Sequence, residues 1–282
     1  IAIASGIANR FVVGDPRIRR MLVLTGRPVD RAASGEQLAR AGEIVCSAEV
    51  TARLSSSVPL REQRETPEGE RYFVFGDTVL ELRDDSWPAC PLLTIEQVRP
   101  WLLPSVAERL ERGAGEFLAG FKPAVALFIR FSGIDYDRAP DTGARLDSLV
   151  ALTQRTLDEY GGDLLSVTVG DKGSYLYATF GALRAHEHDA RRAVATALAL
   201  QERSRSLGFD PALQIGIAEG PSYAGAYGGT SQRTFGVLGK DVNLAARLMS
   251  QAPAGGVLVS PSVARAVEPW FELHELPTMV LK

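Results

Sequence analysis

One stretch toward the C-terminal end carries the side chains best suited to chemistry. Asn243 and Arg247 lie four residues apart, so a helix would place both on one face, one turn apart. An amide beside a planar, permanently charged guanidinium suits an oxygen-rich anion such as a phosphate. Polar residues with no function on an exposed helix surface can have the same spacing, so spacing alone does not distinguish an anion-binding pair from an ordinary helix surface. A strand at Phe235–Leu238, a turn at Gly239 and a helix from about Asp241 would position the pair.

A weaker version of this stretch lies near the start of the chain. Three pairs of segments match: residues 26–34 with 239–247 and 41–47 with 254–260, offset by 213 (239 − 26), and 1–6 with 215–220, offset by 214 (215 − 1). The chain therefore contains an internal repeat. In the first copy Asp30 and Ser34 stand where the second copy has Asn243 and Arg247, so only the second copy keeps the amide and the guanidinium.

The second copy predicts a complete small domain. Strands are expected at residues 124–131, 164–169, 175–180, 212–218 and 235–238, and helices at 145–160 and 189–207. The order strand, helix, hairpin, helix, strand is that of a split βαβ, ferredoxin-like domain. We therefore predict an α+β fold with two pseudo-symmetric copies, of which the first is incomplete.

The first copy matches only the later part of the second. It is expected to contain a strand at 1–5, a hairpin of residues 10–13 and 21–24, a helix over 29–41 and a strand at 43–46. Ile1 corresponds to Ile215, whereas the second copy begins near Lys122, so about half of the first copy is expected to be missing from this chain. We assign residues 1–54 to the C-terminal half of the first domain, 55–121 to a connector and 122–282 to the second domain.

The connector is expected to hold a β-hairpin and an amphipathic helix. Arg71–Phe75 and Thr78–Leu82 flank a two-residue Gly-Asp turn, and the segment before them is rich in turn residues. Residues 94–118 have helical periodicity interrupted by Pro100 and Pro104. A last strand is expected at 279–281.

Composition narrows the class of protein. The 282 residues allow one large or two ordinary domains, and contents of 45% apolar and 23% charged residues are typical of soluble globular proteins. A net charge of -3 favours neither nucleic acid nor an anionic membrane as a partner. Cys46 and Cys90 fit a reducing compartment, and no apolar run reaches transmembrane length. We expect a cytoplasmic protein with no nucleic-acid partner and no membrane span.

Outside residues 55–122, nearly all of the chain resembles the class III nucleotidyl cyclases, and most closely the tandem soluble adenylyl cyclases. The resemblance is carried by Gly170–Gly173 before a strand ending at Phe180-Gly181, and by residues 186–190, 215–220 and 234–249. It implies a cyclase domain fold, an antiparallel-rich sheet with flanking helices. It also implies the reaction, in which the ribose 3′-hydroxyl of ATP attacks the α-phosphorus to give cyclic AMP and pyrophosphate.

The resemblance assigns roles to four residues. Arg247 would bind the α-phosphate, where negative charge grows in the transition state and fixed donors lower the barrier. Asn243 would orient the ribose, and the backbone around Gly236 and Val237 would meet the adenine edge. A pseudoenzyme that keeps the same motif for packing is the other interpretation.

Two magnesium (or manganese) ions are implied as cofactors. The family holds them with one aspartate in a Phe-x-Asp-x-Ser-Gly strand and another in a hairpin Gly-Asp. The second copy has Arg130 at the first position, and its Asp171 is followed by Lys172. We expect the metals to be held by the first copy, with Asp171 kept as a candidate ligand. The predicted partners are therefore ATP and either the missing half of the first domain or a second cyclase chain.

The choice of purine stays open. Adenylyl cyclases of this group usually offer a lysine from the hairpin and a threonine or aspartate beside the glycine turn. Here the hairpin offers Ser166 or Val167, and Gly236 fills the other place. Lys172 is a candidate substitute for the missing lysine, although a lysine in such a turn is more often simply solvated.

Three functions are compatible with these features. The first is the catalytic core of an adenylate cyclase, with the second domain supplying Asn243 and Arg247. The second is an inactive cyclase-homology module for nucleotide sensing or dimerisation in a larger signalling protein, and the third is a plain interaction domain. In every case the chain alone is expected to have little or no cyclase activity, because half of the metal site is missing from it.

Overall fold

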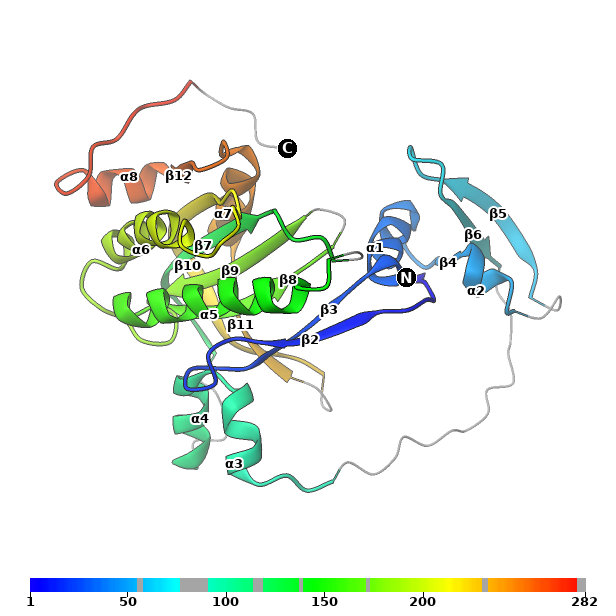
Figure 1. The fold of residues 1–282 in the computed structure, drawn as a ribbon, viewed down its shortest axis with the longest axis horizontal. Helices are drawn as coiled ribbons and strands as arrows, with labels where there is room; N and C mark the ends of the chain where they lie inside the picture. The colour runs from blue at the N-terminus through cyan, green and yellow to red at the C-terminus, as the bar shows by residue number, and fades with distance from the viewer. Residues whose placement is uncertain are drawn as a thin grey trace. The chain divides into compact units, whose positions relative to one another are not determined.

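The computed structural model describes residues 1–54, 58–76, 91–113, 119–136, 139–170, 173–229 and 233–277. The chain divides into two compact units, whose elements are labelled in Figure 1. The first unit consists chiefly of Ile1–Phe11 and Val23–Thr94, and the second of Val12–Leu22, Ile95–Thr168 and Gly173–Lys282. Residues 12–22 therefore belong to the first repeat copy by sequence but to the second unit by packing.

The second unit is built on a six-stranded sheet. Its strands are β7 (Gly120–Phe131), β8 (Asp163–Thr168), β9 (Ser174–Phe180), β10 (Gln214–Gly228), β11 (Arg233–Leu238) and β12 (Val257–Val259). The order is β11-β10-β7-β9-β8, all antiparallel, while β12 pairs with β10 in parallel. The long central strands read as apolar runs because both of their faces are covered.

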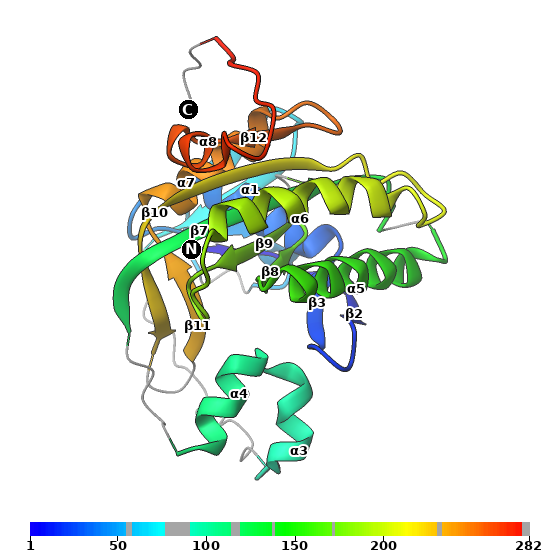
Figure 2. The same ribbon diagram turned by 90° about the vertical axis from the view of Figure 1, so that its left-hand side faces the viewer.

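Two long helices lie side by side on one side of this sheet, α5 (Thr142–Tyr160) and α6 (Asp189–Ser204) (Figure 2). The buried face of α5 is formed by residues spaced mostly three or four apart, which include Leu146, Leu149, Val150, Thr153 and Leu157. The helix ends as the sequence predicts, because Gly161 adopts the left-handed conformation, with φ 77°.

The remaining helices of the second unit are shorter. They are α3 (Ile95–Val98), a 3₁₀ turn (Arg99–Trp101), α4 (Pro104–Glu111), α7 (Lys240–Gln251) and α8 (Pro261–Val267). The predicted interruptions at Pro100 and Pro104 are confirmed, since each proline lies in the first two positions of a new helical segment. One apolar cluster joins α7 and α4 to the sheet through residues that include Val106, Phe128 and Leu248.

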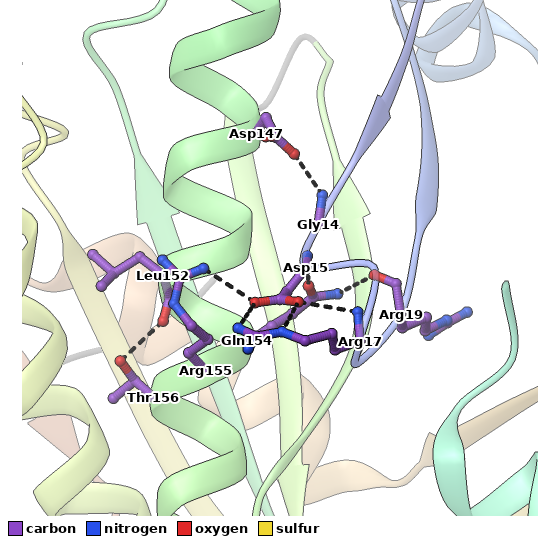
Figure 3. A network of polar contacts seen from close by, with 9 residues as sticks. All are labelled: Gly14, Asp15, Arg17, Arg19, Asp147, Leu152, Gln154, Arg155 and Thr156. Atoms are coloured by element: carbon purple, nitrogen blue, oxygen red, sulfur yellow. Dashed lines mark hydrogen bonds and ion pairs between the residues drawn. The ribbon is translucent and has the colours of Figure 1, made fainter. Parts of the chain in front are cut away.

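The predicted hairpin at the start of the chain is present as β2 (Asn9–Val13) and β3 (Met21–Thr25), and α5 holds its loop (Figure 3). The buried Gln154 amide accepts the Asp15 N–H at 2.6 Å and donates to the Arg19 carbonyl at 2.8 Å. The Gly14 N–H donates to Asp147 at 2.8 Å. Gly14 has φ 105°, and a Cβ there would lie 2.7 Å from the Gln154 Oε1. Only glycine allows this approach.

Charged groups complete the contact between the loop and α5. The Asp15 carboxylate is buried and binds Arg17 at 3.0 Å and Arg155 at 3.3 Å. These hydrogen bonds, chiefly those from Arg17, hold the pKa of Asp15 well below its usual range. Arg19 donates to two carbonyl oxygens of the β8 segment, each at 3.2 Å. We call this set of contacts around Gln154 and Asp15 the hairpin clasp.

The first unit has a four-stranded sheet in the order β1-β4-β6-β5. Its elements are β1 (Ala2–Ile3), α1 (Arg27–Leu38), β4 (Ile44–Ser47), α2 (Ala48–Thr51), β5 (Leu60–Glu65) and β6 (Arg71–Phe75). A small apolar core is formed by Val45, Tyr72 and Val74. Arg64 of β5 binds Glu43 at 2.6 Å and Glu62 at 2.8 Å.

Strand register confirms that the sequence repeat is also a structural repeat. In the first unit, Ala2 pairs with Val45 in parallel. Adding the offsets of the repeat (2 + 214 and 45 + 213) gives Gly216 and Leu258, which pair in parallel in the second unit. The strand pairs β1–β4 and β10–β12 are therefore equivalent, and each is linked by a helix of the repeated signature, α1 or α7.

The connector differs from the expectation in one respect. β6 is the predicted first strand of the hairpin, but its antiparallel partners are β4 and the preceding β5. Sequence patterns did not identify β5, because Leu60–Glu65 is mostly charged and exposed. Residues 78–82 and 279–281 lie outside the described residues. The matched segments of the repeat end at residue 47 and the first domain is assigned to residues 1–54, whereas the first compact unit continues to Thr94. The division at 54 and 121 stays a prediction.

None of the helices in the described part of the chain is long and apolar enough to cross a membrane.

Candidate functional site

Helix α7 presents Asn243 and Arg247 on one face, as their spacing predicts. Both residues are exposed, whereas the opposite face buries Val242, Ala245 and Leu248 against the sheet. Among the described residues, neither side chain has a hydrogen-bond or ion-pair partner. A guanidinium and an amide are therefore held by a packed helix and left open to solvent. This arrangement suits the binding of a phosphorylated ligand.

Strand β11 leads into α7 and carries the two predicted base-contact positions. Gly236 is buried and pairs with Gly225 of β10. Val237 is also buried, and its carbonyl oxygen accepts a hydrogen bond of 2.9 Å from the Tyr177 hydroxyl. One lone pair of the backbone oxygen expected to meet the base is therefore already engaged by a tyrosine of β9.

The equivalent helix of the first unit, α1, has a different surface. Asp30 and Ser34 replace the amide and the guanidinium, as the sequence shows. The neighbouring Arg31 is ion-paired with Glu49 at 2.5 Å and with Glu70 at 3.4 Å. Its charge is already compensated within the unit. At the position equivalent to Arg247, α1 therefore has the Ser34 hydroxyl and no guanidinium.

The described residues of the second copy do not fit a pair of metal ions. Asp171 and Lys172 lie outside the described residues. Arg130 occupies the position of the family's first aspartate, and a Cβ at Gly173 would lie 3.0 Å from its Nε. A guanidinium therefore covers this end of the β8–β9 turn, and a nearby positive charge disfavours a dication. Over the described ranges, no cluster of three His, Cys, Asp or Glu side chains could hold a metal.

Tyr177 and Tyr227 were not singled out by sequence reasoning, yet both lie at the predicted base-contact positions. Tyr177 stacks on Phe128, with ring centroids 4.4 Å apart and planes 10° apart. The Tyr227 ring lies against the Cα of Gly236. Tyr177 pairs with Ser166 of β8 and shares its face, which alternation along β9 alone does not show. The contact between Tyr227 and Gly236 depends on the β10–β11 register and has no local signal.

The comparison with protein families decides the assignment. Residues 142–282, half of the chain, match the family described as "Adenylate and Guanylate cyclase catalytic domain". The chain belongs to this class III nucleotidyl cyclase family. The match covers α5 to the end of the chain and includes the whole signature of β11 and α7.

Curated relatives are much longer than this chain. It is 26% identical over 169 residues to adenylate cyclase type 10 of Homo sapiens, covering 59% of this chain and 10% of that protein. It is 22% identical over 314 aligned positions to the same cyclase of Oryctolagus cuniculus, covering 100% of this chain and 19% of that protein. The chain thus spans no more than about a fifth of the length of these relatives.

Solved structures show the same fold. The guanylate cyclase domain of RhGC from Catenaria anguillulae, in complex with GTP, has a TM-score of 0.52 at 23% identity, covering 57% of this chain and 91% of that one. The catalytic core of a rhodopsin-guanylyl cyclase with converted specificity, in complex with ATPαS, has a TM-score of 0.51 at 22% identity, with coverage of 57% and 90%. The predicted α+β cyclase fold is confirmed.

Proposed function

We propose that this chain is part of the catalytic core of an adenylate cyclase, which converts ATP to cyclic AMP and pyrophosphate. The observation that carries the proposal is the open pair of Asn243 and Arg247 on α7, rigidly supported and unpartnered among the described residues. The curated relatives named adenylate cyclase type 10 favour ATP as the substrate. The solved cyclase domains include a guanylate cyclase domain in complex with GTP, so similarity in fold does not by itself favour ATP over GTP.

The two side chains have distinct roles in this proposal. When the ribose 3′-oxygen attacks the α-phosphorus, negative charge grows on the non-bridging α-phosphate oxygens. Arg247 donates hydrogen bonds to those oxygens from a fixed position, so that the transition state is stabilised more than the bound substrate. Asn243, one helical turn earlier, holds the ribose so that its 3′-oxygen is in line with the bond to be broken.

Magnesium or manganese, two ions in the complete site, would supply activation of the ribose hydroxyl and neutralisation of the phosphates. The described residues of the second copy do not fit these ions, because Arg130 replaces an acidic ligand. We therefore propose that the metals are held chiefly by the metal-binding half of a first cyclase domain or by a second cyclase chain. Asp171 stays a candidate ligand. The proposed location is the cytoplasm.

A non-catalytic alternative rests on one specific observation, the arginine at the metal position of the second copy. In this alternative the chain is a cyclase-homology module that binds a nucleotide for sensing or dimerisation. Both proposals predict ATP binding that depends on Arg247. Only the first predicts that the α7 face completes an active site.

The experiment that separates them is complementation. The chain is mixed with a class III catalytic domain that keeps both metal-binding aspartates but whose own α-phosphate arginine has been changed to alanine. Cyclic AMP formation from ATP and magnesium is then followed. Neither component should be active alone, and the mixture should be active.

The matched control is the same mixture made with Arg247→Ala. Loss of the complemented activity supports the catalytic proposal. Activity that is unchanged by Arg247→Ala would show that the α7 face is not part of the site. No activity in a mixture that still binds ATP through Arg247 would favour the non-catalytic module.

A further inference from the structure

Among the described residues, the two positions at the base end that usually distinguish purines carry no charged side chain. On β11 the position is Gly236, which has no side chain, and on β8 the residue is Ser166. The α7 N-cap, Gly239, lies three positions after Gly236 along extended chain, a span of about 10 Å. This span is on the scale of a nucleoside, so a nucleotide whose phosphate lies on α7 can place its base near Gly236.

The space beside Gly236 is occupied by a tyrosine from the neighbouring strand. Gly225 pairs with Gly236 and Tyr227 pairs with Thr234, so Tyr227 and Gly236 share one face of the β10–β11 ribbon. A Cβ at Gly236 would lie 2.3 Å from the Tyr227 Cε1 and 3.2 Å from its hydroxyl oxygen. Residue 236 is compatible only with glycine while the ring stays there. The tyrosine hydroxyl therefore stands where a side chain of residue 236 would otherwise point.

The Tyr227 hydroxyl is available to a ligand. The residue is 43% exposed, and its hydroxyl has no hydrogen bond to any residue in the described part of the chain. Tyr177 is fixed on the other side of the Gly236-Val237 peptide, because it donates to the Val237 carbonyl at 2.9 Å and stacks on Phe128. The two tyrosines thus bracket the segment expected to meet the base. One is locked in place and the other is open.

We propose that Tyr227 is the residue of this site that contacts the purine base, and that it does so through its hydroxyl. This inference rests on the proposed nucleotide-binding function of α7. A hydroxyl both donates and accepts. It can accept from the adenine amino group or donate to the adenine ring nitrogen, and it can equally donate to the guanine oxo group or accept from the guanine N1–H. A site read by this group binds ATP and GTP with similar affinity, whereas a buried charged reader would reject one of them.

The test is a binding titration of the 282-residue chain by calorimetry, with ATP, GTP and inorganic tripolyphosphate as three separate probes. Tripolyphosphate has no base, so it reports the phosphate end alone. The variants are Tyr227→Phe, which removes only the hydroxyl, and Arg247→Ala. The matched control is Tyr223→Phe on the same strand and face, whose ring instead packs edge-on to Phe121 at 5.9 Å.

The wild-type affinities for ATP and GTP are expected to lie within about 10-fold of each other. Tyr227→Phe should weaken both about 3- to 10-fold, the effect of one neutral hydrogen bond, and leave tripolyphosphate unchanged. Tyr223→Phe should change none of the three. The inference would be overturned if Tyr227→Phe bound ATP and GTP as tightly as the wild type. It would also be overturned if the substitution weakened the affinity for tripolyphosphate as much as the affinity for ATP.

The Arg247→Ala arm separates this inference from the function on which it rests. If Arg247→Ala weakens all three probes while Tyr227→Phe weakens none, the proposed function stands and the role of Tyr227 is wrong. If Arg247→Ala weakens none, or if the wild-type chain binds no probe, the proposed function fails and the inference fails with it.

Discussion

Removing the side-chain amide of Gln154 should loosen the hairpin clasp and destabilise the second unit. Gln154 is 2% exposed, and its amide makes hydrogen bonds of 2.6 Å and 2.8 Å to two backbone groups of the β2–β3 loop. In Gln154→Ala, the Asp15 N–H and the Arg19 carbonyl lose their partners. Each buried backbone group left unpaired costs about 1–3 kcal/mol. The Arg19 carbonyl is only partly buried, so we expect a total loss of about 3 kcal/mol in the free energy of unfolding.

The matched control is Gln201→Ala on α6. Gln201 also bonds a backbone carbonyl through its Nε2, that of Gly255 at 2.6 Å, but the contact is single and exposed. Its loss should cost no more than about 1 kcal/mol. Urea unfolding followed by circular dichroism measures both changes, and hydrogen exchange at the Asp15 amide reports the clasp directly. Equal shifts of the unfolding midpoint for the two variants, with the Asp15 amide still protected in Gln154→Ala, would refute this account.

Two further predictions concern the site and the pH dependence of stability. In a complemented active site, Arg247→Lys should have a kcat about 10²–10³ below that of the wild type, because an ammonium does not reproduce the planar guanidinium. Ser34→Ala, at the equivalent position of the first copy, should leave kcat unchanged. Steady-state kinetics measures both variants, and equal effects at the two positions would show that the site lies elsewhere. Burial raises the pKa of Asp163 from 3.8 to about 6, so its folded form holds a proton that the unfolded chain has lost, and stability should fall as the pH rises from about 4 to 6. Asp163→Asn should therefore stabilise the chain above pH 6 by up to about 3 kcal/mol and have little effect at pH 4, measured as urea midpoints at both pH values; a stabilisation that does not depend on pH would contradict the assignment.

Local patterns were enough to predict the elements of the site but not its tertiary contacts. The spacing of Asn243 and Arg247 and the glycine before α7 are properties of a few consecutive residues, so the helix and its open face follow from sequence. The contact of Tyr227 with Gly236 depends on the strand register, and the contact of Gln154 with Asp15 joins residues 139 apart. Nothing near these residues in the sequence signals such contacts. The charged strand β5 was missed for the same reason, since its pairing with β6 defines it.

The hairpin clasp also has a consequence for the order in which the chain can fold during synthesis. The loop around Asp15 leaves the ribosome 139 residues before Gln154, its hydrogen-bond partner. At 5–20 residues per second, the interval is about 7 to 28 s. During this time the loop has no protein partner for the Asp15 amide or the Arg19 carbonyl. The second unit therefore becomes complete only when α5 has been made and has captured a loop that was synthesised long before it, a long-range closure of the kind that slows folding.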